Sequence, residues 1–367
     1  MATKVSRIAR LRLQRQRIVG GKFESPAQVV SWLGAMQAQD YAAALWAIGL
    51  RTRDATLAQV EQAIAERRIV RTWPMRGTLH FLAAEDVRWM SALMAPRVIA
   101  NNKSRLQREF DLDDAVLARC RKVLVKALRD GQRLTRSDAY AKLEEAGIST
   151  AKQRGIHITG RLAQEGLLCL GPRADKQPTF VLLDEWIPDS RTMPREQALA
   201  ELARRYFHSH GPATVQDFAW WSGLTVKDVQ LAIELAAADL AQEVIDGRLY
   251  LHSGEESESE EDVAGDPHLL PSFDEYLVAY KDRSEAVEAR FSQRVIGING
   301  LFNASLVIDG RIVGTWKRNI DKAGLTVELS PFRVLLRKEQ KSLDEAARRY
   351  GDFIGLPVQL KLLEKQH

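Results

Sequence analysis

Residues 69 to 82 read Ile69-Val70-Arg71-Thr72-Trp73-Pro74-Met75-Arg76-Gly77-Thr78-Leu79-His80-Phe81-Leu82, and this stretch decides how the chain is interpreted. Two β-like runs, 69–72 and 78–82, flank a linker that contains proline and glycine, which is the pattern of a hairpin. Helices are predicted just before it, at 41–48 and at 57–68. Helices followed by a hairpin have the element order of a winged helix, so we expect such a unit here.

The same order recurs further along the chain. Helices are predicted at 85–101, 113–129, 135–145 and 150–165, followed by wing strands at 167–170 and 180–183. In the helix at 150–165, Thr150, Arg154, His157 and Arg161 recur at i, i+4, i+7 and i+11 and form one polar stripe. This helix is therefore the predicted recognition helix of a second winged-helix unit.

A third unit is predicted from helices at 195–210, 214–222 and 225–238 and a β-pair around the Asp246-Gly247 turn. Its last helix carries few cations, so we expect a scaffolding role. The segment after it, 255–266, is mainly acidic residues and serine and is expected to form a loop. Runs at 295–296, 304–308, 312–316 and 325–329, a helix at 341–354 and a strand at 358–362 then predict a β-rich C-terminal module.

The fold class predicted from these elements is α+β, mainly α, with three tandem winged-helix units and a C-terminal β-rich module. The predicted boundaries are 1–110, 111–190 and 191–254 for the three units, 255–266 for the acidic loop, and 267–367 for the module. A chain of 367 residues with 45% hydrophobic residues is long enough for several cores.

A second stretch, Leu33-Gly34-Ala35-Met36-Gln37-Ala38-Gln39-Asp40-Tyr41, gathers neutral hydrogen-bonding groups and contains no recognisable nucleophile. A helix is predicted from the Ser25 cap through Met36, so Gln37 and Gln39 fall near its end. If the helix breaks there, the two amides could converge and orient one water molecule. The alternative is a pair that only caps and solvates a helix end. Asp40 could be a base, but we favour a capping or bracing role for it.

Charge and composition narrow the class of protein. The net charge is +5 and the pI is about 9.1, which suits an anionic partner. Cys120 and Cys169 have no metal-ligand spacing, so we expect neither a disulfide nor a metal site, and a reducing cytoplasmic location. No run is long and apolar enough for a membrane helix. The Arg-rich residues 5–19 predict a folded basic helix rather than a transit peptide, with either a phosphate-binding or a merely solvated cationic face.

The chain lacks the short motifs that mark several common enzyme classes. The chain contains no GxxxxGK[ST] phosphate loop, no GxSxG elbow, no CxxC pair and no zinc deaminase signature. Arg71 and Arg76 in the first hairpin, with Arg154, His157 and Arg161, are the predicted DNA contacts, although arginines in a hairpin can equally brace a loop. His80 lies inside a β-pattern, where an isolated histidine is more often a core residue than a catalyst.

Four segments in one order resemble the AlkZ-like DNA glycosylases, a winged-helix family. They are 33–51 with the Gln-apolar-Gln pattern, 71–80, 270–277 and 299–316. The resemblance implies that Gln37 and Gln39 are the catalytic pair. It also implies the branch that unhooks crosslinks, because a sister branch carries Asp at the second position. The acidic residues Asp274 and Glu275 receive no catalytic part from the resemblance, and we expect them to brace the fold.

The implied function is that of a monofunctional DNA glycosylase acting on N7-alkylated purines, including N7-linked interstrand crosslinks. A cationic N7-alkylated purine leaves with little acid assistance, so a neutral pair that positions water could suffice. We expect duplex DNA as the partner, no cofactor, a monomer, and a bacterial cytoplasmic location beside the nucleoid. The alternative is a non-catalytic winged-helix transcriptional regulator, which would have no need of the Gln pair; a protein that only binds an alkylating drug is a third possibility.

Overall fold

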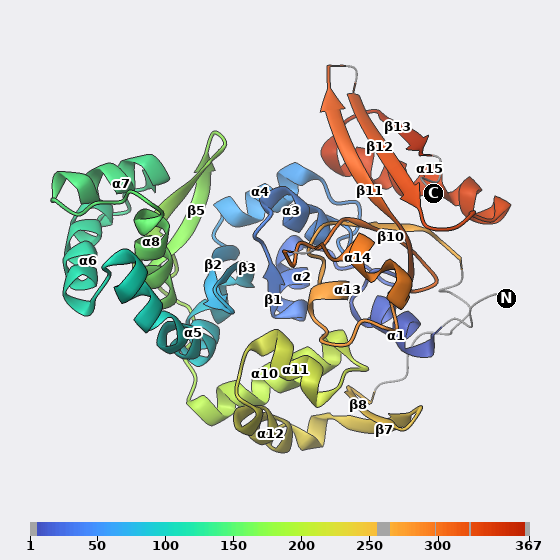
Figure 1. The fold of residues 1–367 in the computed structure, drawn as a ribbon, viewed down its shortest axis with the longest axis horizontal. Helices are drawn as coiled ribbons and strands as arrows, with labels where there is room; N and C mark the ends of the chain where they lie inside the picture. The colour runs from blue at the N-terminus through green and yellow to red at the C-terminus, as the bar shows by residue number, and fades with distance from the viewer. Residues whose placement is uncertain (1–5, 255–264, 298, 323, 364–367) are drawn as a thin grey trace.

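The computed structural model describes residues 6–254, 265–297, 299–322 and 324–363. The architecture is mixed α and β (Figure 1). The predicted acidic loop lies almost wholly outside the described residues. Within the described part, no helix is long and apolar enough to cross a membrane.

Residues 6–110 form helices packed beside a hairpin, as predicted. Thr56 caps the helix Leu57–Ala65, because its side chain accepts the Gln59 N–H. The elements are α1 (Arg7–Arg15), α2 (Pro26–Leu33), β1 (Ala35–Gln37), α3 (Tyr41–Gly49), α4 (Leu57–Ala65), β2 (Ile69–Met75), β3 (Thr78–Ala83) and α5 (Val87–Phe110).

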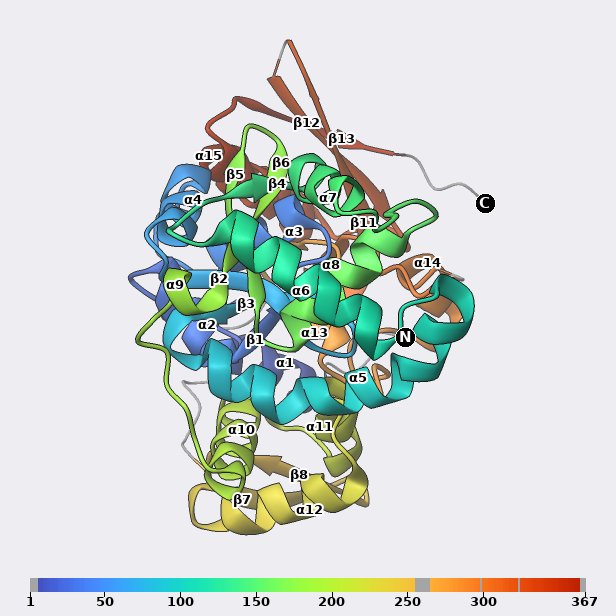
Figure 2. The same ribbon diagram turned by 90° about the vertical axis from the view of Figure 1, so that its left-hand side faces the viewer.

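Residues 111 to 190 again place helices before a hairpin. Figure 2 shows α5 running along the base of this group. The elements are α6 (Asp114–Leu128), β4 (Leu134–Thr135), α7 (Arg136–Glu145), α8 (Arg154–Gln164), β5 (Leu168–Ala174), β6 (Gln177–Leu182) and α9 (Leu183–Trp186).

The remaining residues form a third helical group with a hairpin and then a β-rich module. The third group has α10 (Arg195–His210), α11 (Val215–Ser222), α12 (Val226–Leu235), β7 (Ala241–Ile245) and β8 (Arg248–His252). The module has β9 (His268–Leu270), α13 (Glu275–Val278), α14 (Ser292–Val295), β10 (Ser305–Ile308), β11 (Arg311–Asp321), β12 (Gly324–Pro331), α15 (Arg337–Ile354) and β13 (Val358–Leu362).

Several local predictions were wrong. The predicted recognition helix begins at Arg154, and Thr150 lies outside it, where its hydroxyl donates to Glu144 Oε1 at 2.7 Å. The β-run predicted at 295–296 includes the last residue of the helical turn α14, because Val295 is buried in the core from that turn. Neither β9 nor α13 was predicted.

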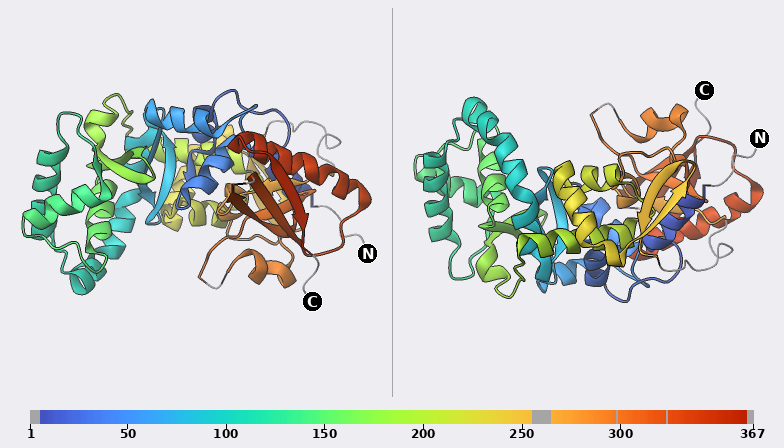
Figure 3. Two further views of the ribbon diagram at one scale, coloured as in Figure 1. Left: turned by 90° about the horizontal axis from the view of Figure 1, so that it is seen from above. Right: turned by 90° about the horizontal axis from the view of Figure 1, so that it is seen from below.

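The hairpins of the first two groups join into one sheet, which the sequence did not predict. The six strands have the order β1-β3-β2-β5-β6-β4, and Arg71 pairs with Leu170 where β2 meets β5. The C-terminal module has its own five-stranded sheet, in the order β13-β12-β11-β10-β9. Figures 1 and 3 place α6 to α8 and the C-terminal module at opposite ends of the molecule, with β1 to β3 between them.

Three hydrophobic clusters form the described core. The first combines residues of α1 to α4 with residues of the C-terminal module; the Tyr350 ring, for example, contacts the rings of both Trp46 and Trp316. The second packs α5 against α10 to α12, and the third lies within α6 to α8 and the hairpins. Helices α1 to α4 are thus packed against the C-terminal module. The winged-helix interpretation and the domain boundaries stay predictions.

Candidate active site

Gln37 is the last residue of a β-strand and does not lie at a helix end. Helix α2 ends at Leu33, and Gly34 adopts φ +75°, a conformation that a side-chain-bearing residue rarely takes. The chain then enters β1, which pairs with β3 so that Gln37 is opposite His80. Ala38 continues the pairing, with its N–H 2.7 Å from the Leu79 carbonyl. The chain bends at Gln39, beyond the end of β1, so the two glutamines are not successive residues of one strand face.

The two amides are in different states. The Gln39 side chain is exposed, and its Oε1 accepts the Leu79 N–H at 3.3 Å. A backbone N–H can only donate, so this contact fixes which end of the amide is the oxygen and directs the NH2 group elsewhere. Gln37 is half-buried, and its side-chain amide has no hydrogen-bond partner among the described residues. One donor group and one complete amide therefore remain available to a ligand.

Arg71 braces the backbone between the two glutamines. Its Nε and one Nη donate to the Ala38 carbonyl at 3.0 and 2.6 Å, and the same Nη is 3.4 Å from the Gln39 carbonyl. Its guanidinium also lies over the Tyr41 ring, 5.1 Å from the centroid, and burial lowers the pKa of Arg71 to about 10. The guanidinium is thus engaged within the protein.

A buried polar cluster lies behind Gln37. His80 is fully buried and its Nδ1 is 2.9 Å from the Thr78 carbonyl, so Nδ1 carries the proton and Nε2 accepts from Arg76 at 3.2 Å. Burial, together with the nearby charge of Arg76, lowers the pKa of His80 to about 3. Burial also lowers the pKa of Arg76, which the carboxylate of Glu275 partly offsets. His80 is therefore a neutral core residue in this fold.

A pocket of about 280 Å³ adjoins Gln39, between α5 and α8. Of the predicted DNA contacts, His157 and Arg161 line it, and Arg71, Arg76 and Arg154 do not. The His157 ring lies against Phe110, with centroids 4.0 Å apart, and its buried Nε2 has no partner. The other lining residues are Trp73, Gly77, Asn102, Arg105, Leu106, Gln153, Ile156, Gly160 and Gln164.

The other two predicted arginines have internal partners as well. Arg154 donates to the Phe110 carbonyl and, at 3.0 Å, to the Ser149 carbonyl. Arg161 lies in the pocket but is paired with Glu165 at 2.7 Å. The structure thus brings His157 and Arg161 together with Gln39 at the pocket, and Arg154 is not among the residues that line it.

Asp40 has a local structural contact. Its Oδ1 accepts the Ala43 N–H at 3.1 Å and caps α3. Asp274 is equally engaged, because both of its oxygens bind the fully buried Arg51 at 2.7 and 2.9 Å. The expectation that Asp274 braces the fold agrees with this ion pair.

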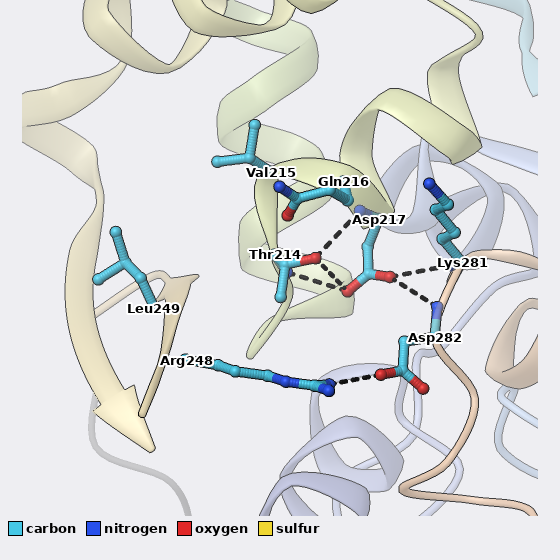
Figure 4. Close-up of a pocket in the computed structure, with 8 residues that line it drawn as sticks. All are labelled: Thr214, Val215, Gln216, Asp217, Arg248, Leu249, Lys281 and Asp282. Atoms are coloured by element: carbon cyan, nitrogen blue, oxygen red, sulfur yellow. Dashed lines mark hydrogen bonds and ion pairs between the residues drawn. The ribbon is translucent and has the colours of Figure 1, made fainter. Parts of the chain in front are cut away.

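A larger cavity of about 700 Å³ lies elsewhere, between the start of α11 and the β7–β8 hairpin (Figure 4). Three of its charged groups have partners within the protein: Asp217 accepts from the backbone of Lys281 and Asp282, and Arg248 pairs with Asp282. None of the site residues predicted from the sequence lines it. Among the described residues, no group of three or more His, Cys, Asp or Glu side chains could hold a metal ion.

Glu275, which the sequence analysis expected only to brace the fold, contacts Gln37 directly. It is 1% exposed and its Oε1 accepts the Gln37 N–H at 2.8 Å. Sequence reasoning missed Asn102, Arg105 and Gln153, which reach the pocket only through the packing of α5 on α8.

Comparison with known proteins gives one consistent result. A family model described as "DNA glycosylase AlkZ-like" matches residues 30–353. The interstrand DNA cross-link repair glycosylase of Streptomyces sahachiroi is 27% identical over 368 residues, covering 95% of this chain and 97% of that protein. The solved structure of Streptomyces sahachiroi DNA glycosylase AlkZ has a TM-score of 0.78 at 25% identity, covering 96% of this chain and 98% of that one.

Proposed function

Because the chain belongs to the AlkZ-like family of DNA glycosylases, enzymes that hydrolyse N-glycosidic bonds, we propose that it is a monofunctional enzyme excising N7-alkylated purines from duplex DNA. The name of the Streptomyces sahachiroi relative extends the proposal to interstrand crosslinks joined through purine N7. The enzyme acts as a monomer on the DNA of the bacterial nucleoid.

Gln37 and Gln39 position the attacking water. The observation that supports this role is that both glutamines lie beside β3, where the Gln39 Oε1 accepts the Leu79 N–H and the Gln37 amide has no partner among the described residues. The free NH2 of Gln39 donates a hydrogen bond to the water oxygen, and the Gln37 Oε1 accepts a hydrogen bond from one water O–H. The water lone pair that remains points at the anomeric carbon.

A neutral pair is adequate for this substrate. The N7-alkylated base is a cation, so its departure generates a neutral leaving group and needs no acid. The electrophile is an oxocarbenium-like sugar, as in glycoside hydrolysis. Orientation of the nucleophile then supplies most of what a protein can add, and well-oriented groups can contribute several kcal/mol.

DNA is held on the side of the Gln39 pocket. His157 and Arg161 lie there, and Arg105 adds a cation from α5. Arg76, also predicted as a DNA contact, lies behind Gln37 instead, where its Nη is 3.2 Å from His80 Nε2. Arg71 braces the backbone of the site, because its guanidinium binds the Ala38 carbonyl, whereas Arg154 binds the Ser149 and Phe110 carbonyls.

The experiment is single-turnover incubation with duplex DNA that carries one N7-methylguanine, followed by alkaline cleavage of abasic sites. Gln37→Ala with Gln39→Ala should abolish strand cleavage and leave DNA affinity largely intact. Gln340→Ala is the control, since Gln340 lies in α15 and bonds only the Leu335 carbonyl and its own helix. Excision that survives the double substitution would refute the role of the pair.

A further inference from the structure

The edge of β1 that faces away from β3 bears on the orientation of Gln37. In the antiparallel pair with β3, Ala38 donates to the Leu79 carbonyl, so the pairing alternates and Gln37 directs its own N–H away from β3. No strand covers that side, because β1 is the first strand of the sheet. An edge N–H held inside a protein needs an acceptor.

We propose that Glu275 is a positioning residue that sets the orientation of Gln37 by binding this edge N–H. Oε1 of Glu275 accepts it at 2.8 Å, across 238 residues of sequence. The inference rests on the proposed role of Gln37. It concerns no contact with DNA or with the reacting atoms, since Glu275 is 1% exposed.

Glu275 is itself fixed by three separate elements. It belongs to the first turn of α13, which the Asp274–Arg51 ion pair anchors. Its Oε2 accepts from Trp221 Nε1 of α11 at 3.1 Å, and His210 of α10 lies 3.7 Å from the same oxygen. These contacts hold the carboxylate in place. Its hydrogen bond to the Gln37 N–H therefore restrains the backbone from which the Gln37 side chain extends.

Gln37 is thereby held on both sides. On the β3 side lie His80, whose tautomer is fixed by Thr78 and Arg76, and the Ala38–Leu79 pairing. On the open side lies Glu275. Without it, β1 has three residues and no second partner, and the amide of Gln37 shifts relative to that of Gln39.

The chemistry of Glu275 supplies a rescue test. The two groups that hydrogen-bond to the carboxylate, Gln37 N–H and Trp221 Nε1–H, are both donors. Only an ionised carboxylate accepts at both oxygens. In Glu275→Gln, the amide oxygen satisfies one donor and the NH2 group opposes the other. Trp221→Phe removes the indole donor, so in the combined variant the amide oxygen is free to bind Gln37 N–H.

We expect Glu275→Ala to lower the single-turnover excision rate constant by about 100-fold, the scale of a small misplacement of a reacting group. Its affinity for N7-methylguanine DNA, measured by fluorescence anisotropy and normalised to folded protein, should be unchanged. Glu275→Gln should be impaired, and Glu275→Gln with Trp221→Phe should recover most of the rate. The control is Glu339→Ala: Glu339 is also a buried carboxylate that accepts a backbone N–H, but it pairs with Arg333 in the C-terminal module.

Either of two results with the Glu275 variants would overturn the inference: full excision by Glu275→Ala, or no recovery when Trp221→Phe is added to Glu275→Gln. Loss of excision in Glu339→Ala as large as in Glu275→Ala would also overturn it, because the effect would then follow from removing any buried carboxylate. Failure of the proposed function is seen separately, as excision that persists in Gln37→Ala with Gln39→Ala.

Discussion

Replacement of Arg71 by methionine separates bracing of the site from DNA binding. Methionine keeps most of the apolar stem and removes the guanidinium, which donates twice to the Ala38 carbonyl at 3.0 and 2.6 Å. Hydrogen bonds to charged groups contribute about 1.5–3 kcal/mol. At about 1.4 kcal/mol per tenfold in rate, loss of that restraint from the catalytic geometry corresponds to roughly a 10- to 100-fold slower excision step.

The assay is single-turnover excision of N7-methylguanine beside DNA affinity measured at several salt concentrations. Arg71→Met should slow excision and leave the slope of log affinity against log salt unchanged. Arg173→Met is the matched control, because Arg173 lies 4.8 Å from the same Tyr41 ring but is exposed on the second hairpin. Normal excision with a salt slope reduced by about 0.9, the value for one lost phosphate contact, would refute the bracing role and assign Arg71 to DNA.

Three further predictions concern stability and reactivity. Asp40→Ala should lower the free energy of unfolding by about 1 kcal/mol through loss of the α3 cap and leave excision intact; abolished excision would instead make Asp40 the base. Burial lowers the pKa of His80 and of His268 to about 3, so both are neutral when folded. Above pH 6.5 this has no effect, but as the pH falls from 6.5 toward 3 the unfolded chain binds the extra protons, so stability should fall by up to about 1.4 kcal/mol per pH unit for each histidine. Urea unfolding at pH 7, 5 and 4 measures this, and a flat profile would contradict it. Burial raises the pKa of Cys120 to about 11 and that of Cys169 as well, so neither thiol should react with Ellman's reagent before the chain unfolds in urea.

Features set by neighbouring residues were predictable from the sequence. Threonine is a preferred N-cap residue, and in four helices its side chain accepts the backbone N–H three residues later. These threonines are Thr56, Thr135, Thr214 and Thr225. The Asp246-Gly247 turn joins β7 and β8, and both residues have positive φ. A cap or a two-residue turn depends on atoms a few bonds apart along the chain, so a local pattern is sufficient evidence for it.

Features set by distant residues were not predictable. Arg12 lies in the basic helix at the N-terminus, which suggested a cationic face for phosphate or solvent. It is 3% exposed, donates to the Pro212 carbonyl at 2.9 Å and lies over the Tyr280 ring. Its partners are about 200 or more residues away, and helical periodicity carries no information about them.

The candidate site divides in the same way. The sequence by itself determined which residues are the candidates, because the Gln-apolar-Gln pattern and the three accompanying segments are visible without coordinates. Only the tertiary structure decided that Gln37 belongs to a strand and not to the predicted helix, since Gly34 ends α2 early and residues 35–37 pair with β3. Only the tertiary structure brought Glu275 to the Gln37 N–H and α8 to Gln39, because a short edge strand takes its conformation from what packs against it.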